Sequence, residues 1–295
     1  MMNAKPKIAL AIGILCISIF PILVRLQLTT GLISAFYRMF IAAVLLLPYI
    51  IVTKKFQLPN TKNILLASLS GVVFAIDIAI WNIAIQHSSA TQATLLANLS
   101  PVWVGFGSFL FLKSKPVLNF WIGTTIALIG MVILVGFEVF SQLHFDLAFT
   151  FALVSGMLYA TYILMSKKIL SQMEVFSFMS IVLVSSSLFL GLVCWGANES
   201  FKGFSNTAWF VLFIQGAICQ LTAWLLISYA TQHLRATRVS LSLLGQAVLA
   251  TFLAWIFLDE KMSGFRIIGA VFLLLGIRIT FYDKPISYKN LKHKP

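Results

Sequence analysis

The sequence predicts an all-α integral membrane protein with ten transmembrane helices, arranged as two inverted five-helix repeats, and with both termini in the cytoplasm. Three observations predict it: long apolar runs, basic residues between those runs, and an internal repeat. Of the 295 residues, 60% are hydrophobic and 10% are charged, and the mean hydropathy is +0.98. Soluble domains carry about 25% charged residues. The composition therefore excludes an ordinary soluble enzyme, a disordered chain and a disulfide-rich secreted module.

Ten apolar runs have the length of a membrane-spanning helix. A helix rises 1.5 Å per residue, so about 20 residues cross the ~30 Å hydrocarbon core. Barrel strands need only about 10 alternating residues. No small-residue cleavage site follows the first run, so we expect a retained span rather than a signal peptide. The predicted spans are Ile8–Leu26, Gly31–Val52, Ile64–Gln86, Ala90–Leu112, Val117–Phe137, Leu147–Ser166, Val175–Gly196, Thr207–Ala230, Ala236–Leu258 and Gly264–Phe281.

Lysine and arginine fall mainly in every second connection between these spans. Positively charged connections stay on the cytoplasmic side of a membrane. With the N-terminus inside, the inner segments hold 15 of the 21 basic residues. Topology therefore explains the formal net charge of +13, and no nucleic-acid partner is required. We expect a multi-pass protein of the cell membrane, which is the inner membrane if the source is a Gram-negative bacterium.

An internal repeat relates the two halves of the chain. An ungapped offset of 146 residues aligns residues 86–130 with residues 232–276 and gives fourteen identities, including a shared Gln-His-x-x-Ala-Thr motif. Each copy holds five predicted spans. Because five is odd, the second copy enters the membrane in the opposite direction. We therefore assign residues 1–143 to the first repeat and residues 144–295 to the second, which ends in a short basic cytoplasmic tail.

Inverted repeats are the architecture of many secondary transporters. Two copies of one fold, inserted oppositely, can exchange conformations and so open one central site to either side of the membrane. The sequence thus predicts a secondary active or facilitative carrier of a small molecule that works by alternating access. An intramembrane enzyme and a non-transporting assembly subunit are alternatives of another class. We predict no enzyme, because the spans contain no catalytic triad or paired-carboxylate pattern.

Three segments carry a resemblance to a known family: FLDEKMSGFRIIGAVFLLLGI at 257–277, Tyr37-Arg38, and LLANLSPVW at 95–103. Together with the length and the duplication, they are similar to EamA-type members of the drug/metabolite transporter superfamily. The resemblance implies export of an amino acid or a related amphipathic metabolite. An importer of a metabolite such as S-adenosylmethionine is the alternative within that class. One departure is Ser114, where the family usually has an acidic residue; the second repeat keeps Glu260.

Charges at bilayer depth usually face a cavity or a partner, so they are candidates for a substrate site. At 1.5 Å per residue, Arg38, Asp77 and Asn98 lie about 10, 13 and 12 Å below the outer surface. Arg38 and Asp77 either form a static ion pair or contact a charged or zwitterionic substrate. In the second case, Asp77 is the candidate coupling group that accepts a proton. The sequence leaves both interpretations open.

Other candidates share this depth. Pro101 removes a helical hydrogen bond and predicts a kink beside Ser100. In the second half, the equivalent positions carry no charges. That half offers the amides Gln215 and Gln220 in the eighth span and Gln246 in the ninth. The predicted substrate-binding residues are Arg38, Asp77, Trp81, Asn98, Ser100, Pro101, Trp103, Gln215 and Gln246.

The sequence predicts neither a metal nor a cofactor, because no His, Cys, Asp and Glu residues have metal-ligand spacing and no phosphate-binding loop occurs. The predicted partners are a small-molecule metabolite and the lipid bilayer, with protons as a candidate coupling ion. The substrate, the direction, uniport or proton coupling, and the choice between monomer and homodimer are left open.

Overall fold

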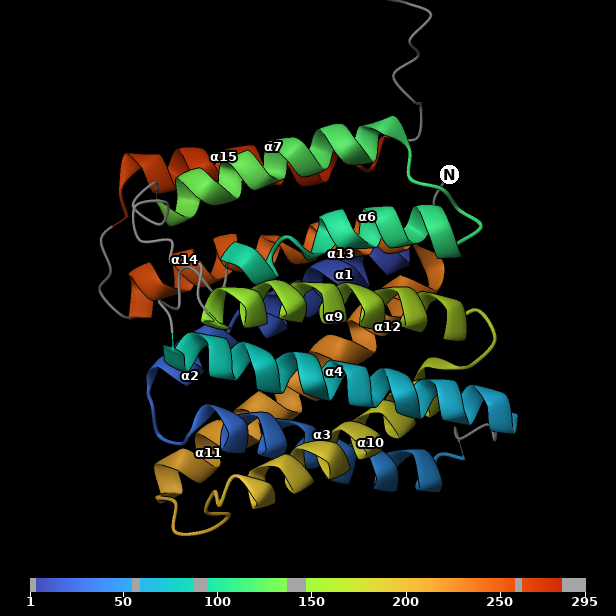
Figure 1. The fold of residues 1–295 in the computed structure, drawn as a ribbon, viewed down its shortest axis with the longest axis vertical. Coiled ribbons are helices and arrows are strands. Elements are labelled where there is room, and N and C mark those ends of the chain that lie inside the picture. The colour runs from blue at the N-terminus through green and yellow to red at the C-terminus, as the bar shows by residue number, and fades with distance from the viewer. Residues whose placement is uncertain (1–3, 55–58, 88–94, 137–146, 258–261, 283–295) are drawn as a thin grey trace, which may run out of the picture.

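A computed structural model describes residues 4–54, 59–87, 95–136, 147–257 and 262–282. Within these ranges all regular secondary structure is helical, and the helices lie side by side in one bundle (Figure 1). Eight helical segments in the described part of the chain are long and apolar enough to cross a membrane, and a shorter apolar segment covers Leu95–Phe111. The membrane character that the sequence predicts is therefore confirmed, whereas the count of ten spans stays a prediction.

The helices of the first half are α1 (Ala4–Ile17), α2 (Phe20–Arg25), α3 (Gly31–Val52), α4 (Thr61–His87), α6 (Ser100–Phe111) and α7 (Leu118–Val135). Those of the second half are α9 (Leu147–Ile169), α10 (Val175–Gly196), α11 (Asn206–Ile214), the π-helix η1 (Gln215–Thr222), α12 (Ala223–His233), α13 (Ala236–Leu243), α14 (Gly245–Phe257) and α15 (Gly264–Ile279). The predicted boundary between residues 143 and 144, the start of the fourth span and Glu260 lie outside the described residues.

Hydroxyl side chains cap the N-termini of several of these helices. Thr30 accepts a hydrogen bond from the backbone N–H of Ile33 at the start of α3, at 3.4 Å. Ser205 and Ser263 cap α11 and α15 in the same way, at 3.2 and 3.3 Å. Each cap satisfies a backbone donor that has no partner within its helix. Local sequence thus sets where these helices begin.

Two spans are interrupted at positions that the repeat makes equivalent. Asn98 and Leu99 form a turn before α6, and Pro101 lies in the first turn of that helix, where the kink was predicted. In the second half, α13 ends at Leu243 and α14 begins at Gly245. The residue between them, Leu244, lies 146 positions after Asn98. The second interruption contains no proline, so its position could not be read from residue type.

Helices α7 and α15 pack together at one edge of the bundle through glycines (Figure 1). A Cβ added to Gly123 would lie 2.5 Å from the carbonyl oxygen of Gly276, and one added to Gly130 would lie 2.7 Å from that of Gly269. The start of α7 therefore meets the end of α15, so the two helices are antiparallel. Under the offset of 146, Gly123 matches Gly269 and Gly130 matches Gly276, so each contact maps onto the other.

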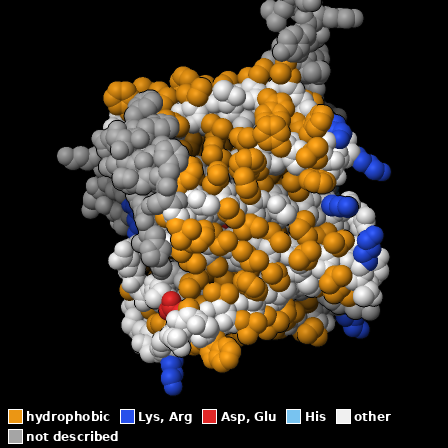
Figure 2. Space-filling view, in the orientation of Figure 1, with side chains coloured by type: hydrophobic (Ala, Val, Ile, Leu, Met, Phe, Trp, Pro, Cys, Tyr) orange, Lys and Arg blue, Asp and Glu red, His pale blue; other side chains and the backbone are white. Residues whose placement is uncertain are grey.

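The outer surface suits a lipid environment. Figure 2 shows apolar side chains across the middle of one face, with lysine and arginine side chains at its margins. The ends of α3, α6 and α9 and the start of α4 lie at one end of the bundle (Figure 1). Exposed lysines accompany these helix ends: Lys54, Lys62, Lys113, Lys115 and Lys168.

The glycine contact yields a stability prediction. We expect Gly276→Ala to lower the melting temperature in detergent and to cost about 1–3 kcal/mol, because the new methyl group has no room between the two backbones. Gly264→Ala, on the same helix, is the matched control, since nothing lies within 4 Å of a Cβ there. Equal melting temperatures for the two variants would show that the close contact does not stabilise the fold.

Candidate functional site

Arg38 on α3 and Asp77 on α4 are both buried inside the bundle, each with 6% of its surface exposed. The two side chains lie within electrostatic range of each other. Among the interactions of the described residues, however, no ion pair joins them. A static Arg38–Asp77 salt bridge is therefore not what holds α3 and α4 in place.

Each charge has a different neighbour. The Ser155 hydroxyl on α9 donates a hydrogen bond to Asp77 Oδ1 at 2.6 Å, across the interface between α9 and α4. The guanidinium carbon of Arg38 lies 4.3 Å from the ring centroid of Phe20 on α2, in a cation–π contact. The Nε of Arg38 is buried and has no hydrogen-bond partner. Both charges are thus only partly compensated by the protein.

The π-helix η1 lies against α3 at the level of Arg38. Gln215, the first residue of η1, accepts a hydrogen bond from the Ser34 hydroxyl at 2.7 Å. Gly216 permits close approach, because an added Cβ would lie 2.7 Å from Ile41 and 3.4 Å from the carbonyl oxygen of Arg38. Short π-helical turns inside α-helices occur frequently at functional sites. Of the predicted residues, Arg38, Asp77 and Gln215 are therefore carried by elements that meet in the interior.

A cluster of four aromatic side chains from α4, α9 and α12 lies beside the site. Phe74 stacks on Tyr162 with ring centroids 4.3 Å apart, and Trp224 lies 4.8 Å from Phe74 and 6.1 Å from Tyr159. Tyr159 is also within electrostatic range of Asp77 and Arg38. The sequence alone did not predict a role for these four residues or for Ser155. The available signal was that Tyr159, Tyr162 and Trp224 lie well inside apolar spans rather than at their ends.

The interruption before α6 approaches the same region through α9. Gly156 follows Ser155, and a Cβ added there would lie 3.0 Å from the carbonyl oxygen of Ala97. Ala97 is four residues before Pro101, so its carbonyl lacks the usual helical donor. Ser100 and Pro101 are buried and Asn98 is partly buried. The turn before α6, where Pro101 predicts a kink, thus packs against α9, the helix whose Ser155 donates a hydrogen bond to Asp77.

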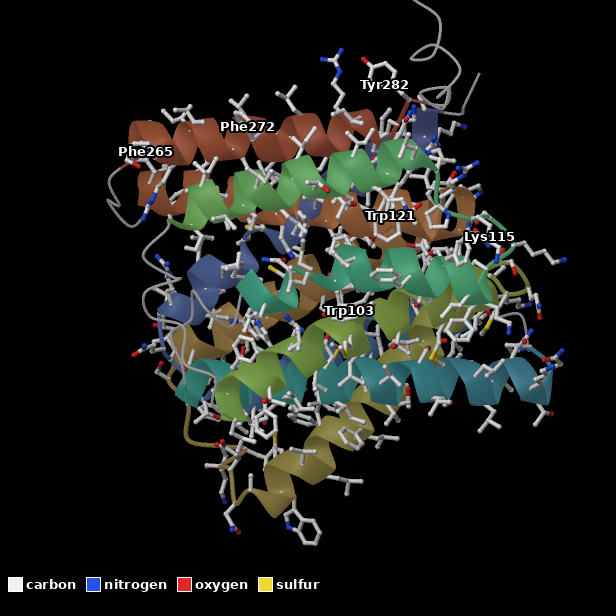
Figure 3. The ribbon with its side chains drawn as sticks, turned by 45° about the horizontal axis from the view of Figure 1, so that its top comes forward. Trp103, Lys115, Trp121, Phe265, Phe272 and Tyr282 are labelled. Atoms are coloured by element: carbon white, nitrogen blue, oxygen red, sulfur yellow. The ribbon has the colours of Figure 1, made fainter. Side chains whose placement is uncertain are left out.

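The remaining predicted residues are less closely connected. Trp103 on α6, labelled in Figure 3, packs against the main apolar core, and its indole N–H is buried without a partner. Trp81 on α4 and Gln246 on α14 are both partly buried. Within the described ranges, no hydrogen bond, ion pair or ring contact joins either of them to Arg38, Asp77 or Gln215. Their assignment to the site stays a prediction.

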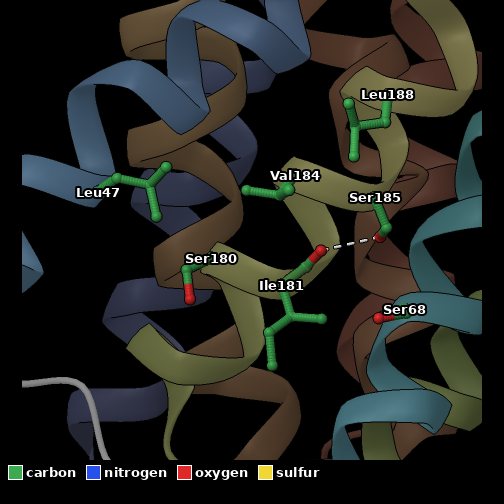
Figure 4. Close-up of a pocket in the computed structure, with 7 residues that line it drawn as sticks. All are labelled: Leu47, Ser68, Ser180, Ile181, Val184, Ser185 and Leu188. Carbon is green, nitrogen blue, oxygen red and sulfur yellow. Dashed lines mark hydrogen bonds between the residues drawn. The ribbon is translucent and has the colours of Figure 1, made fainter.

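A shallow groove lies elsewhere, between α3, α4 and α10 (Figure 4). Its wall is mainly apolar, and the Ser185 hydroxyl donates to the carbonyl oxygen of Ile181 at 2.8 Å, within its own helix. None of the predicted site residues lines this groove. Its lining residues are Leu47, Ser68, Ser180, Ile181, Val184, Ser185 and Leu188.

In the described part of the chain, no group of three His, Cys, Asp or Glu side chains could hold a metal ion. Around Arg38 and η1, the described residues offer the Asp77 carboxylate, the Arg38 guanidinium, buried amides and an aromatic wall. These groups can bind the polar and apolar parts of a small solute.

Comparisons with known proteins show the family and the fold of this chain. The sequence pattern of the EamA-like transporter family matches residues 5–136 and again residues 146–282. An uncharacterized transporter of Archaeoglobus fulgidus is 24% identical over 293 residues, which cover 95% of this chain and 98% of its own. The uncharacterized transporter YdfC of Bacillus subtilis is 24% identical over 248 residues, which cover 84% of this chain and 80% of its own. A crystal structure of a protein that is 13% identical matches the fold with a TM-score of 0.81, over 99% of this chain and 100% of that one.

Apolar helices of membrane length define a multi-pass protein of the cell membrane. The two matches to the family pattern cover most of the chain, so the protein belongs to the EamA-like transporter family. The resemblance stated from three short segments is thereby confirmed. The family and the named relatives are described as transporters.

The contribution of the Ser155–Asp77 hydrogen bond to the free energy of unfolding can be measured. We expect Ser155→Ala to lower the free energy of unfolding by about 1–3 kcal/mol, because it leaves a buried carboxylate without its donor. The measurement is thermal unfolding in detergent. Ser166→Ala on the same helix is the control, since the Ser166 hydroxyl donates to the carbonyl oxygen of Tyr162 in its own helix. A loss in Ser155→Ala no larger than in the control would contradict the importance of this bond.

Proposed function

We propose that this transporter exports an amino acid or a related amphipathic metabolite by alternating access around a central site between α3, α4, α9 and η1. One observation carries the proposal: a buried cation and a buried anion lie near each other without forming an ion pair. Burial of a charge without a full counter-charge is costly in a membrane. A zwitterionic substrate supplies an anion for Arg38 and a cation for Asp77.

Two further features support the alternating-access part of the proposal. The family pattern matches the chain twice, over two segments of similar length. The glycine contacts of α7 and α15 follow the two-fold relation expected of inverted copies. Paired copies of opposite orientation allow one site to face either side in turn. The direction of export rests on the family resemblance alone.

The proposed orientation has the exposed lysines at the ends of α3 and α9 on the cytoplasmic side. In a variant with Cys16, Cys194 and Cys219 replaced by alanine, we expect Lys202→Cys to react with a membrane-impermeant maleimide in intact cells. Lys54→Cys should react only after the cells are permeabilised, because the hairpin after α3 faces the cytoplasm. Labelling of both positions from outside would contradict the inverted topology.

Asp77 is the proposed coupling group. We expect Asp77→Asn to abolish substrate exchange, because a neutral amide cannot bind a cationic group or accept a proton as the carboxylate does. The assay is counterflow in proteoliposomes with labelled L-amino acids tested singly, after a metabolite screen of overexpressing cells has shown which solutes change. An unchanged elution volume and melting temperature would show that the variant is folded.

Glu174→Gln is the matched control, because this acid is exposed and lies just before α10. We expect it to exchange substrate as the wild type does. Retained exchange by Asp77→Asn would eliminate Asp77 as a coupling group. Absence of exchange by the wild type with every L-amino acid and with every solute found in the metabolite screen would contradict the proposed substrate class.

A further inference from the structure

The π-helix η1 carries a buried amide whose hydrogen-bonding atoms are all unused. Gln220 has no exposed surface, and neither its Nε2 nor its Oε1 has a hydrogen-bond partner. Nearly all buried polar groups in folded proteins are hydrogen-bonded, so an amide with no partner requires an explanation. A buried amide without a protein partner can hydrogen-bond to a ligand.

A second buried amide in the same helix, Gln215, does have a hydrogen-bond partner. Gln215 is also buried, yet its Oε1 accepts a hydrogen bond from Ser34 on α3 at 2.7 Å. The two glutamines therefore differ in role although they share a helix, a residue type and near-complete burial. Gln215 fixes η1 to α3, whereas Gln220 stabilises nothing by hydrogen bonding in this structure.

The residues about one turn before and one turn after Gln220 show which other helices its face of η1 packs against. Gly216, about one turn earlier, packs against Ile41 and the carbonyl oxygen of Arg38. Trp224, about one turn later, packs against Phe74 and Tyr162. This side of the helix therefore runs from α3 towards the aromatic group of α4 and α9. Its first part packs on α3, which carries Arg38, and its continuation at Trp224 reaches Phe74, three residues before Asp77 on α4.

Two more buried donors in this region have no partner. They are the Nε of Arg38 and the indole Nε1 of Trp224. Together with the amide of Gln220, they offer several N–H donors and one carbonyl acceptor. A carboxylate accepts several hydrogen bonds through its two oxygens, and a neighbouring ammonium, amide or hydroxyl group can donate to the carbonyl oxygen.

We propose that Gln220, with Trp224 Nε1 and Arg38 Nε, forms the subsite that binds the carboxylate of the transported solute. Gln220 Oε1 accepts a hydrogen bond from a donor next to that carboxylate. This inference rests on the proposed function and adds to it the group that the substrate must carry and the residues that bind it.

The test compares Gln220→Leu with Gln215→Leu in detergent without added solute. We expect Gln220→Leu to melt at the wild-type temperature or above it, because no hydrogen bond is lost and a buried polar group is removed. Gln215→Leu should melt at a lower temperature, because it removes the partner of Ser34. Gln220→Met, an unbranched side chain of similar length, repeats the measurement in case leucine does not fit.

The second readout is the KM of counterflow for each ¹⁴C-labelled L-amino acid that the wild type exchanges. We expect Gln220→Leu and Gln220→Met to raise KM about tenfold or more, the usual effect of losing a hydrogen bond to a charged group. An unchanged KM in both variants overturns the subsite and leaves the proposed function intact. Melting temperatures of both variants as low as that of Gln215→Leu overturn it as well, since Gln220 would then be structural. If the wild type exchanges neither an L-amino acid nor any solute found in the metabolite screen, the proposed function fails and the subsite fails with it.

Discussion

Two opposite charges, Arg38 and Asp77, are buried near each other without forming an ion pair, and the arrangement of the helices around them depends on this. A carboxylate and a guanidinium in a membrane interior are tolerated when each has a counter-charge or several hydrogen bonds. Asp77 has one hydroxyl donor from α9, and Arg38 has the face of Phe20. The helices that carry these partners, α2, α3, α4 and α9, are therefore held around an electrostatically incomplete centre.

Close backbone contacts surround this centre and fix the helices that form it. At the α7–α15 contact, glycines let the two backbones approach to distances that a side chain would prevent. Gly156 packs closely against the backbone at Ala97, and Gly216 packs closely against the Ile41 side chain. Small residues are the usual means by which membrane helices associate, because lipid offers no hydrophobic gain from burying larger ones. The rigid contact of α7 with α15 lies at the edge of the bundle, whereas the irregular segments lie nearer the charges.

Those irregular segments give the proposed mechanism its physical basis. The π-helix η1 and the turn before α6 leave backbone or side-chain groups without their ordinary helical partners. In a membrane such groups are stable only where protein or a polar ligand replaces the missing partners. A substrate that bridges Arg38, Asp77 and Gln220 would satisfy several of them at once, and its release would restore the unsatisfied state.

By itself, the sequence determined the class of protein. Runs of about 20 apolar residues specify membrane helices, and the positions of lysine indicate topology, because both depend on transfer of individual side chains between water and lipid. The offset of 146 predicted the duplication, and Pro101 predicted the interruption of one span. Arg38 and Asp77 could be selected because any charge inside an apolar run stands out.

Only the tertiary structure decided which polar groups meet and which remain unsatisfied. In a helix that is apolar all round, hydrophobic periodicity does not mark the buried face, so the sequence could not show that Ser155 reaches Asp77 or that Arg38 is unpaired. Likewise, Gln215 and Gln220 are the same residue type five positions apart, and only the packing of η1 against α3 gives one a partner and leaves the other without. Hydrogen bonding depends on the approach of helices distant in sequence, and residue types alone do not encode that approach.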